Sequence, residues 1–222
     1  MRVAWKPCIA EMIGAFALCF IGAGAICANA LPGVQSGLLG VAIAHGLVLS
    51  IMVSATGHIS GGHLNPAVTA AFWATKRMKA EPALHYMVSQ LVGATIAGFF
   101  LKAIFAESIW RKAQLGTPML APGVTPMTGI FVEAILTFFL VFAVFGTAVD
   151  PSAPKIGGFG IGLTIAFDIL MGGALTGASM NPARTFGPAL AGGYWSGWYV
   201  YWIGPVAGGV IAGMVYDRIR KK

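Results

Sequence analysis

The tripeptide Asn-Pro-Ala occurs twice in this chain, as Asn65-Pro66-Ala67 and as Asn181-Pro182-Ala183, and each copy interrupts a long apolar stretch. Asparagine is a favoured N-cap, and proline, which has no backbone N–H to donate, fits the first turn of a helix. Each copy therefore predicts a helix that begins inside apolar sequence. Paired interruptions at corresponding places in two halves of a chain are typical of a transport site formed by broken helices near the bilayer midplane.

The apolar stretches themselves predict an integral membrane protein. Hydrophobic residues make up 57% of the 222 positions and charged residues only 9%, which leaves too little polar surface for a soluble domain. A helix needs roughly 20 apolar residues to cross a bilayer. Six stretches reach that length, at about 8 to 29, 38 to 56, 83 to 105, 127 to 149, 156 to 175 and 196 to 217. The first is predicted to be a span rather than a cleaved signal peptide, because it contains Glu11 and has the full length of a span.

The net charge of +7 indicates the orientation of a membrane protein rather than binding to nucleic acid. If the six spans alternate, most basic residues outside them fall on one side, which predicts that this side and both termini are cytoplasmic. We expect the plasma membrane as the location. The basic residues on this side are Arg2, Lys6, Lys76, Arg77, Lys79, Lys155, Arg218, Arg220, Lys221 and Lys222.

The two halves of the chain follow one plan. Each begins with a span that carries an acidic residue, Glu11 or Glu133, and continues with a second span, an Asn-Pro-Ala copy and a third span. Three is an odd number, so the second half enters the membrane from the opposite side and the halves form an inverted repeat. We therefore predict an all-α membrane protein and a single channel domain over residues 1–222. Its parts are a first half at about 1–105, an outer connecting loop at about 106–126 and a second half at about 127–222.

The segments around the two tripeptides resemble those of the aquaporin, or major intrinsic protein, family. Residues 57–69 are similar to the family's first half-helix loop and residues 179–189 to its second, and the resemblance extends over essentially the whole chain. It implies six transmembrane helices plus two re-entrant half-helices in a right-handed bundle, and a homotetramer with one pore in each protomer. It also implies a channel rather than an enzyme, with no cofactor and no metal.

The charges and hydrogen-bond donors of such a site also predict which species it passes. A helix N-terminus carries roughly half a positive charge, so two N-termini meeting in a pore oppose cations and hydronium. The amides of Asn65 and Asn181 can donate hydrogen bonds to a passing water and so break the oriented water chain that proton hopping needs. Unpaired carbonyls at membrane depth must face protein or water. The candidates for such pore-lining carbonyls are Gly61, Gly62, His63, Gly177, Ala178 and Ser179.

Arg184 lies within the second motif, and a cation at membrane depth either lines an aqueous path or pairs with an acid. The alternative to a pore role is a salt bridge with Asp168 or Glu133. The resemblance implies that Arg184 belongs to the outer selectivity filter, and counting from the motifs adds His45, Ile169 and Ala178. This combination resembles the filter of plant vacuolar aquaporins that pass ammonia as well as water.

The acids Glu11 and Glu133 have two interpretations. A pair of intramembrane acids is compatible with a proton relay in a coupled transporter. The resemblance implies instead that they brace the loops before the half-helices by accepting hydrogen bonds from unpaired N–H groups. The position of Asp168 in the fold is left open.

The expected function is a passive channel for water and small neutral solutes such as ammonia, excluding protons and ions. In glycerol channels the second motif resembles Asn-Pro-Ala-Arg-Asp with a lysine four residues after the aspartate, whereas this chain has Thr185 and Ala189 at these two places. Glycerol is therefore disfavoured as the main substrate, because a solute whose hydroxyl groups lose their polar partners is bound poorly. The predicted outer loop has no histidine, although some ammonia-passing relatives are thought to use one there. Two alternatives remain, a glycerol or small-polyol facilitator and a junctional membrane protein with little flux.

Overall fold

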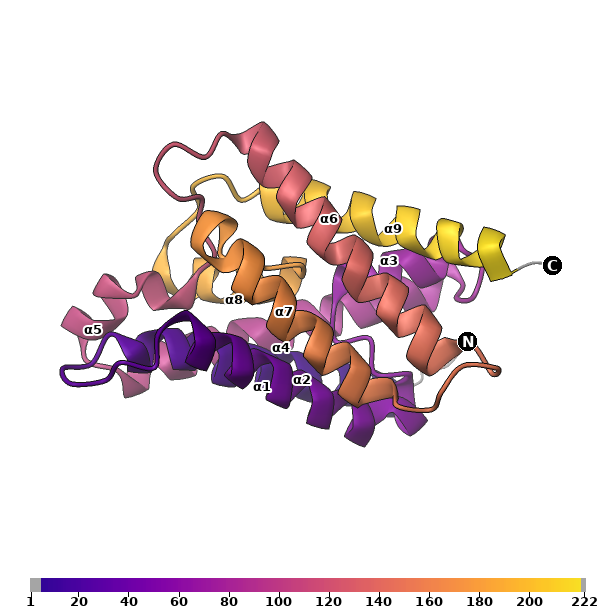
Figure 1. The fold of residues 1–222 in the computed structure, drawn as a ribbon. Coiled ribbons are helices and arrows are strands. Elements are labelled where there is room, and N and C mark those ends of the chain that lie inside the picture. The colour runs from indigo at the N-terminus through magenta and orange to yellow at the C-terminus, as the bar shows by residue number, and fades with distance from the viewer. Residues whose placement is uncertain (1–4, 221–222) are drawn as a thin grey trace.

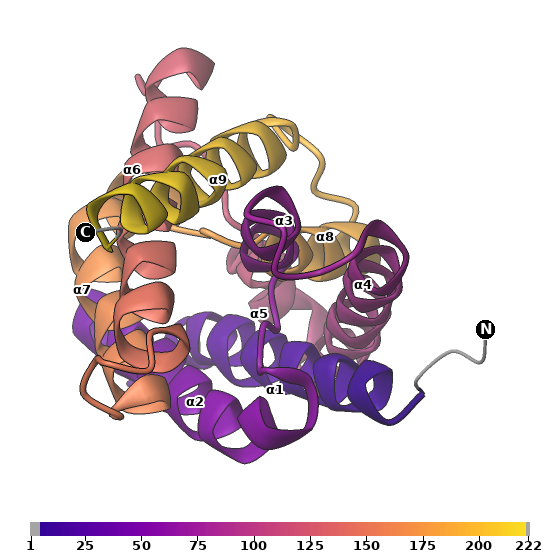
Figure 2. The same cartoon turned by 90° about the vertical axis from the view of Figure 1, so that its right-hand side faces the viewer.

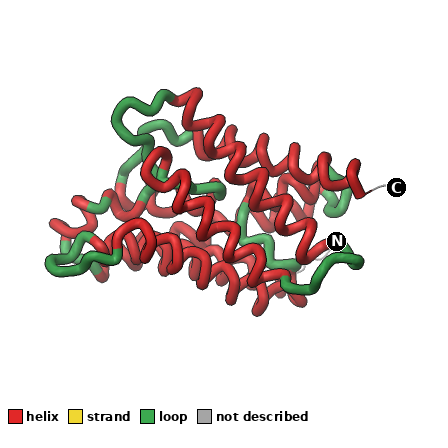
Figure 3. Tube along the Cα trace, in the orientation of Figure 1, coloured by secondary structure: helices red, strands yellow, loops and turns green. Residues whose placement is uncertain are grey.

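The protein is described by a computed structural model, in which residues 5–220 are placed. In this part of the chain the regular elements are helices, connected by turns and loops (Figure 1, Figure 3). They are α1 (Trp5–Asn29), α2 (Gly37–Ser60), α3 (Pro66–Ala74), α4 (Ala80–Ile104), α5 (Glu107–Lys112), the 3-10 turn η1 (Gln114–Gly116), α6 (Pro126–Val144), the π-helical turn η2 (Phe145–Val149), α7 (Gly157–Thr176), α8 (Pro182–Gly192) and α9 (Val200–Arg220).

Five helices of residues 5–220 are both long and apolar enough to cross a membrane: α1, α2, α4, α6 continued by η2, and α7. The predicted sixth span corresponds to α9, which has 21 residues but ends in the charged residues Asp217, Arg218 and Arg220. It begins at Val200 rather than near residue 196, because the segment before it forms turns. Helix α9 packs along α6 and is therefore part of the bundle.

The two helices that begin at the tripeptides are too short to span a bilayer. Helix α3 has 9 residues and α8 has 11, so at 1.5 Å per residue they extend about 14 and 17 Å, roughly half of a hydrocarbon core of about 30 Å. Each lies against the last long helix of the other half, since α3 contacts α9 and α8 contacts α4. Figure 2 shows both short helices between α9 and α4.

The halves repeat in their packing as well as in their order. Helix α1 packs against α2 and α4, and α6 packs in the same way against α7 and α9. A Cβ atom on Gly93 would lie 2.1 Å from the carbonyl oxygen of Met12, and one on Gly208 would lie 2.0 Å from that of Ala134. Glycine is therefore required at both crossings, where it brings two helix backbones into contact.

The two ends of the bundle differ. The N- and C-terminal ends of the chain lie at one end, and α5 lies at the other (Figure 1). At the first end, Arg77 pairs with Asp217 at 2.6 Å and Arg220 pairs with Asp150 at 2.9 Å. The segment between α4 and α6, which holds α5 and η1, corresponds to the predicted outer loop. The division of the chain into a single channel domain with these bounds stays a prediction.

Candidate functional site

A narrow cavity of about 20 Å³ runs between the halves and is lined by residues of both. A water molecule needs roughly 10–15 Å³ of such space, so the cavity admits single waters. Much of its lining is apolar and includes Leu49, Val53, Val68, Leu140, Val144, Ile161, Ile165 and Ile169. Polar groups come from His45, Gly62, His63, Asn65, Ser179, Asn181 and Arg184.

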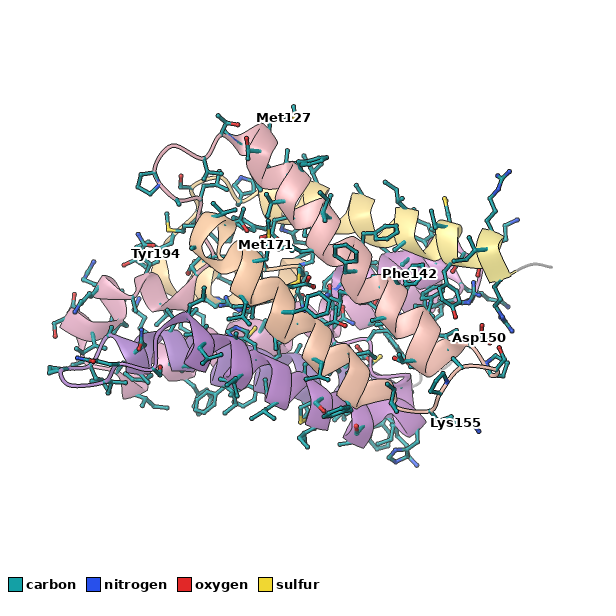
Figure 4. All side chains as sticks on the ribbon, viewed as in Figure 1. Met127, Phe142, Asp150, Lys155, Met171 and Tyr194 are labelled. Atoms are coloured by element: carbon teal, nitrogen blue, oxygen red, sulfur yellow. The ribbon has the colours of Figure 1, made fainter. Side chains whose placement is uncertain are left out.

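At the end of the bundle that holds the chain termini, this passage continues into a wider cavity of about 570 Å³. The two cavities share Val53, Gly62, His63, Val144 and Ile161 in their linings. The wide cavity is also lined by Asp150 and Lys155, which Figure 4 shows at the same end as the C-terminus, whereas Tyr194 lies at the opposite end. The narrow passage therefore has a broad, charged entrance on this side.

The two asparagines of the tripeptides cap their own helices and hold each other's loops. Oδ1 of Asn65 accepts from the N–H of Ala67 at 2.8 Å, while its Nδ2 donates to the carbonyl of Met180 at 2.8 Å. Asn181 does the same, with Oδ1 accepting from Ala183 at 3.0 Å and Nδ2 donating to Leu64 at 3.0 Å. An amide NH2 has two hydrogens, so each asparagine keeps one for a water in the cavity that both residues line.

The loops before the half-helices have a backbone conformation that is rare for residues other than glycine. Leu64 has φ 51° and Met180 has φ 52°, both in the left-handed region, at equivalent positions of the two halves. Such residues cost of order 1–3 kcal/mol and persist where surrounding contacts hold them. The carbonyls that accept from Asn181 and Asn65 belong to these two residues.

Glu11 supplies the contacts that hold the first loop. Its carboxylate is fully buried and accepts hydrogen bonds from the N–H of His63 at 2.9 Å and of Leu64 at 2.6 Å. It also accepts from Oγ of Ser60 at 2.6 Å and from Nε2 of Gln90 at 2.6 Å. Four donors around one buried carboxylate are typical of an ionised acceptor with a structural role.

Glu133 holds the second loop in the same way. It accepts from the N–H of Ser179 at 2.9 Å, from that of Met180 at 2.7 Å and from Oγ1 of Thr176 at 2.7 Å. Neither acid is among the described residues that line the narrow cavity. A relay must exchange protons with the water path, so this geometry favours bracing over proton transfer.

Several partners in these networks were missed by the sequence analysis. Ser60 and Thr176 both lie five residues before the motif asparagine, and their carbonyls accept from the hydroxyls of Tyr86 at 2.9 Å and Tyr201 at 2.8 Å. Alignment of the two halves on their tripeptides would have revealed the hydroxyl residues. Gln90 could not be found in this way. It lies four residues after Tyr86, and the residue four after Tyr201 on α9 is Pro205.

The other predicted residues take different places. Pro66 and Pro182 begin the half-helices, and Ala67 and Ala183 follow them in the buried first turn. Gly61 caps α2 with φ 91° and lines the wide cavity. Gly177 caps α7 with φ 83°, and a Cβ there would lie 2.8 Å from Cα of Pro118. That the backbone carbonyls before each half-helix line a pore stays a prediction.

Arg184 and His45 meet in the part of the cavity nearest η1. Nε of Arg184 donates to Nε2 of His45 at 3.1 Å, and Nη1 donates to the carbonyl of Gly116 at 2.8 Å. Nδ1 of His45 lies 2.8 Å from the carbonyl of Val41. A carbonyl only accepts, so Nδ1 carries the proton, Nε2 is the acceptor and the imidazole is neutral. Arg184 is thus the only cation in this contact.

Ile169 and Ala178 line the same cavity as His45 and Arg184, so the structure brings the four predicted filter positions together. The alternative salt bridge of Arg184 is not seen: none of the ion pairs within residues 5–220 includes it. Asp168 is buried with 1% exposure, and neither carboxylate oxygen has a hydrogen-bond partner among the described residues. Asp168 is also absent from the part of the cavity lining that is described.

Nearly the whole sequence matches one known protein family. The family model described as "Major intrinsic protein" matches residues 2–216. The chain belongs to the major intrinsic protein family. This confirms the predicted aquaporin family and membership of a channel family rather than an enzyme family. It also confirms that the chain is a multi-pass integral membrane protein.

Among curated members of the major intrinsic protein family, the chain is similar to Aquaporin TIP4-4 of Zea mays. The two are 44% identical over 224 residues, which cover 96% of this chain and 86% of the maize protein. It is 43% identical over 221 residues to Aquaporin TIP4-1 of Arabidopsis thaliana, with the same coverage of 96% and 86%.

Among solved structures, the chain is similar to the aquaglyceroporin from Plasmodium falciparum. The TM-score is 0.89 and the sequence identity is 22%, and the match covers 98% of this chain and 97% of that one. At this identity the likeness concerns the fold alone. It confirms the predicted all-α aquaporin fold.

Proposed function

We propose that this member of the family is a passive channel that conducts water and ammonia and excludes protons and ions. The observation that carries the proposal is the narrow cavity of about 20 Å³ in which both motif asparagines, His45 and Arg184 take part. Each asparagine has one N–H left for a water, and the positive half-helix N-termini and Arg184 disfavour cations.

The neutral imidazole supports the ammonia part of the proposal. His45 accepts from Arg184 and keeps no charge of its own, while Ile169 and Ala178 add an apolar and a small side chain. A small neutral solute therefore meets a filter with one cation and little bulk. Ammonium is repelled by Arg184, so the neutral form is the species that passes.

Stopped-flow light scattering on proteoliposomes tests both parts. Osmotic shrinkage measures water flux, and internal alkalinisation under an ammonium gradient measures ammonia flux. We expect both to be fast in the wild type, and ammonia flux to fall selectively in His45→Phe/Ile169→His. Fast water flux with no ammonia flux above empty liposomes would reduce the proposal to a water channel. Negligible water flux in well-inserted protein would support the junctional alternative.

Glycerol facilitation is the second candidate. The solved neighbour is an aquaglyceroporin, but here Arg184 is followed by Thr185 rather than by aspartate. The Thr185 side chain is buried, and its hydroxyl already contacts the hydroxyl of Ser179 at 2.6 Å. Glycerol has three hydroxyls that need partners, and a site without them rejects it. Glycerol uptake by the same proteoliposomes separates the two functions.

The proposal includes a homotetramer in a lipid bilayer, with both termini in the cytoplasm and the plasma membrane as its location. The grouping of Lys155 and Arg220 at the end of the bundle with the wide cavity supports this orientation. Native mass spectrometry tests the tetramer. A fluorescent tag on the chain tests the location. The resemblance of the filter to that of plant vacuolar aquaporins suggests a vacuolar membrane instead, and signal there would contradict the plasma-membrane location.

A further inference from the structure

The ring of His45 is held on three sides. Nδ1 donates to the carbonyl of Val41, Nε2 accepts from Arg184, and the ring edge lies against Gly22 of α1. A Cβ atom on Gly22 would lie 2.3 Å from Nε2, 2.5 Å from Cδ2 and 2.8 Å from Cε1 of His45. The contact with α1 is therefore possible only because residue 22 has no side chain.

The ring cannot yield easily to such a side chain. Ordinary contacts between heavy atoms are about 3.5–4.0 Å, so an alanine at 22 requires the ring and α1 to separate by about 1 Å. Both ring nitrogens are hydrogen-bonded, and turning the ring breaks at least one of these bonds. Helix α1 is also fixed, because the backbone of Met12 lies directly against Gly93 of α4.

The edge of the ring that faces Gly22 is also the edge that carries the bond to Arg184. A Cβ at 22 would come closest to Nε2, and Nε2 is the atom that accepts from Nε of Arg184. His45 lines the cavity, whereas Gly22 is not among the described residues of its lining. A side chain at 22 would therefore act on the cavity through the ring and would disturb this hydrogen bond.

The next residue of α1 supports the other acceptor of Arg184. Gly116, whose carbonyl accepts from Nη1, has φ 68°, and a Cβ on it would lie 2.7 Å from Cα of Ala23. Adjacent residues of the first helix thus position both groups that fix the guanidinium.

We propose that Gly22 is a positioning residue of the filter: it sets where the His45 ring lies, and through the ring it sets the width of the passage and the orientation of Arg184. The inference rests on the proposed channel function. It assigns part of the selectivity to a helix position that does not touch the solute.

The experiment is a double-mutant cycle of Gly22→Ala and His45→Ala, with water and ammonia fluxes measured in proteoliposomes at matched protein content. We expect Gly22→Ala to lower both fluxes by about fivefold or more in the wild-type background, because an extra methyl group in a filled interior displaces its neighbours. In the His45→Ala background the space of the ring accepts the new methyl group, so the same substitution should change the fluxes by less than about twofold. The matched control is Gly24→Ala, since a Cβ there meets only the flexible end of Leu101, at 3.2 Å.

Equal losses in both backgrounds would mean that Gly22 acts through general helix packing and would overturn the proposal, as would unchanged flux in Gly22→Ala. If Gly22→Ala does not insert into the membrane, the double variant Gly22→Ala/His45→Ala should, because it lacks the ring with which the new methyl group clashes. Failure of both would also overturn it. Absence of flux in the wild type would contradict the proposed function instead. The thermal unfolding midpoints of the same four proteins then test the contact, because Gly22→Ala should destabilise only when His45 is present.

Discussion

Nε of Arg184 donates a hydrogen bond to Nε2 of His45 over 3.1 Å. The two residues come from opposite halves of the chain, on α8 and α2, and both are almost fully buried. The bond leaves the guanidinium with a fixed direction and the imidazole without a charge. The electrostatic and the steric parts of the proposed filter are therefore joined in one contact.

Removal of the charge should open the passage to ions. We expect Arg184→Ala to produce a cation or proton conductance absent from the wild type, because the intramembrane cation that repels them is lost. Arg184→Lys is the control: it keeps the charge but loses the planar donor fork, so it should exclude ions while its ratio of ammonia to water flux changes. Electrical recording in planar bilayers checks this, and an ion-tight Arg184→Ala channel would contradict it.

The two bracing acids should be equally important for stability. Glu11→Gln and Glu133→Gln place an NH2 group among donors that need an acceptor, and unsatisfied buried groups cost about 1–3 kcal/mol each. We expect each variant to lose about 2–4 kcal/mol of unfolding free energy. Glu107→Gln is the control, since its pair with Arg111 is 66% exposed on the glutamate side. Denaturation in detergent micelles measures the loss, and a wild-type midpoint for either variant would contradict the bracing role.

The loop after η2 should loosen in acid. Hydrogen bonds from Oγ and N–H of Ser152, with smaller contributions from Tyr216 and Arg220, hold the pKa of Asp150 below its ordinary value of 3.8. A carboxyl with a lowered folded pKa stabilises the fold above its unfolded pKa, and the stabilisation is lost as the pH falls through the folded pKa. We therefore expect no change between pH 7 and pH 5 and a loss below about pH 3.8.

Hydrogen–deuterium exchange of the segment 150–156 measures this change after correction for the intrinsic effect of pH. In Asp150→Asn the segment should exchange at its acid rate at every pH, because the carboxylate that accepts from Ser152 and pairs with Arg220 at 2.9 Å is gone. Acid-dependent loosening that persists in Asp150→Asn would assign the effect to another group.

Asp168 should be dispensable for stability. Its oxygens have no partner among the described residues although the side chain is 1% exposed, and a buried polar group without a partner costs about 1–3 kcal/mol. We expect Asp168→Leu, which is larger but branches at the same carbon and has no polar atom, to raise the unfolding free energy by about 1 kcal/mol and to leave water flux within about twofold. Asp168→Asn, which keeps a polar group, should gain less. A destabilised Asp168→Leu would reveal a partner, such as a bound water, that the carboxyl requires.

Much of the fold could be predicted from the sequence, because membrane spans and helix starts are specified by residues that are neighbours in the chain. The apolar stretches predicted the long helices, and the asparagine and proline of each tripeptide predicted where α3 and α8 begin. The end of α9 was harder, since Asp217 and the last arginines interrupt its apolar run.

Only the parts of the site that are made by distinctive side chains could be predicted from the sequence. Arg184 is conspicuous as a charge in apolar sequence, but its second acceptor is the backbone carbonyl of Gly116 in η1. Every residue has a carbonyl, so no residue type marks this one. Gln90 reaches Glu11 across the helix packing of α1 and α4, and such a contact depends on three-dimensional register that one sequence does not reveal.

The crossed bonds from Asn65 to Met180 and from Asn181 to Leu64 have a consequence for biogenesis. When the first half leaves the ribosome, the Asn65 amide has no acceptor, because Met180 has not yet been synthesised. The first loop is therefore completed only after residue 180 has entered the membrane. Water permeability should thus arise late and all at once, and a chain truncated between the halves would insert its spans without ever conducting.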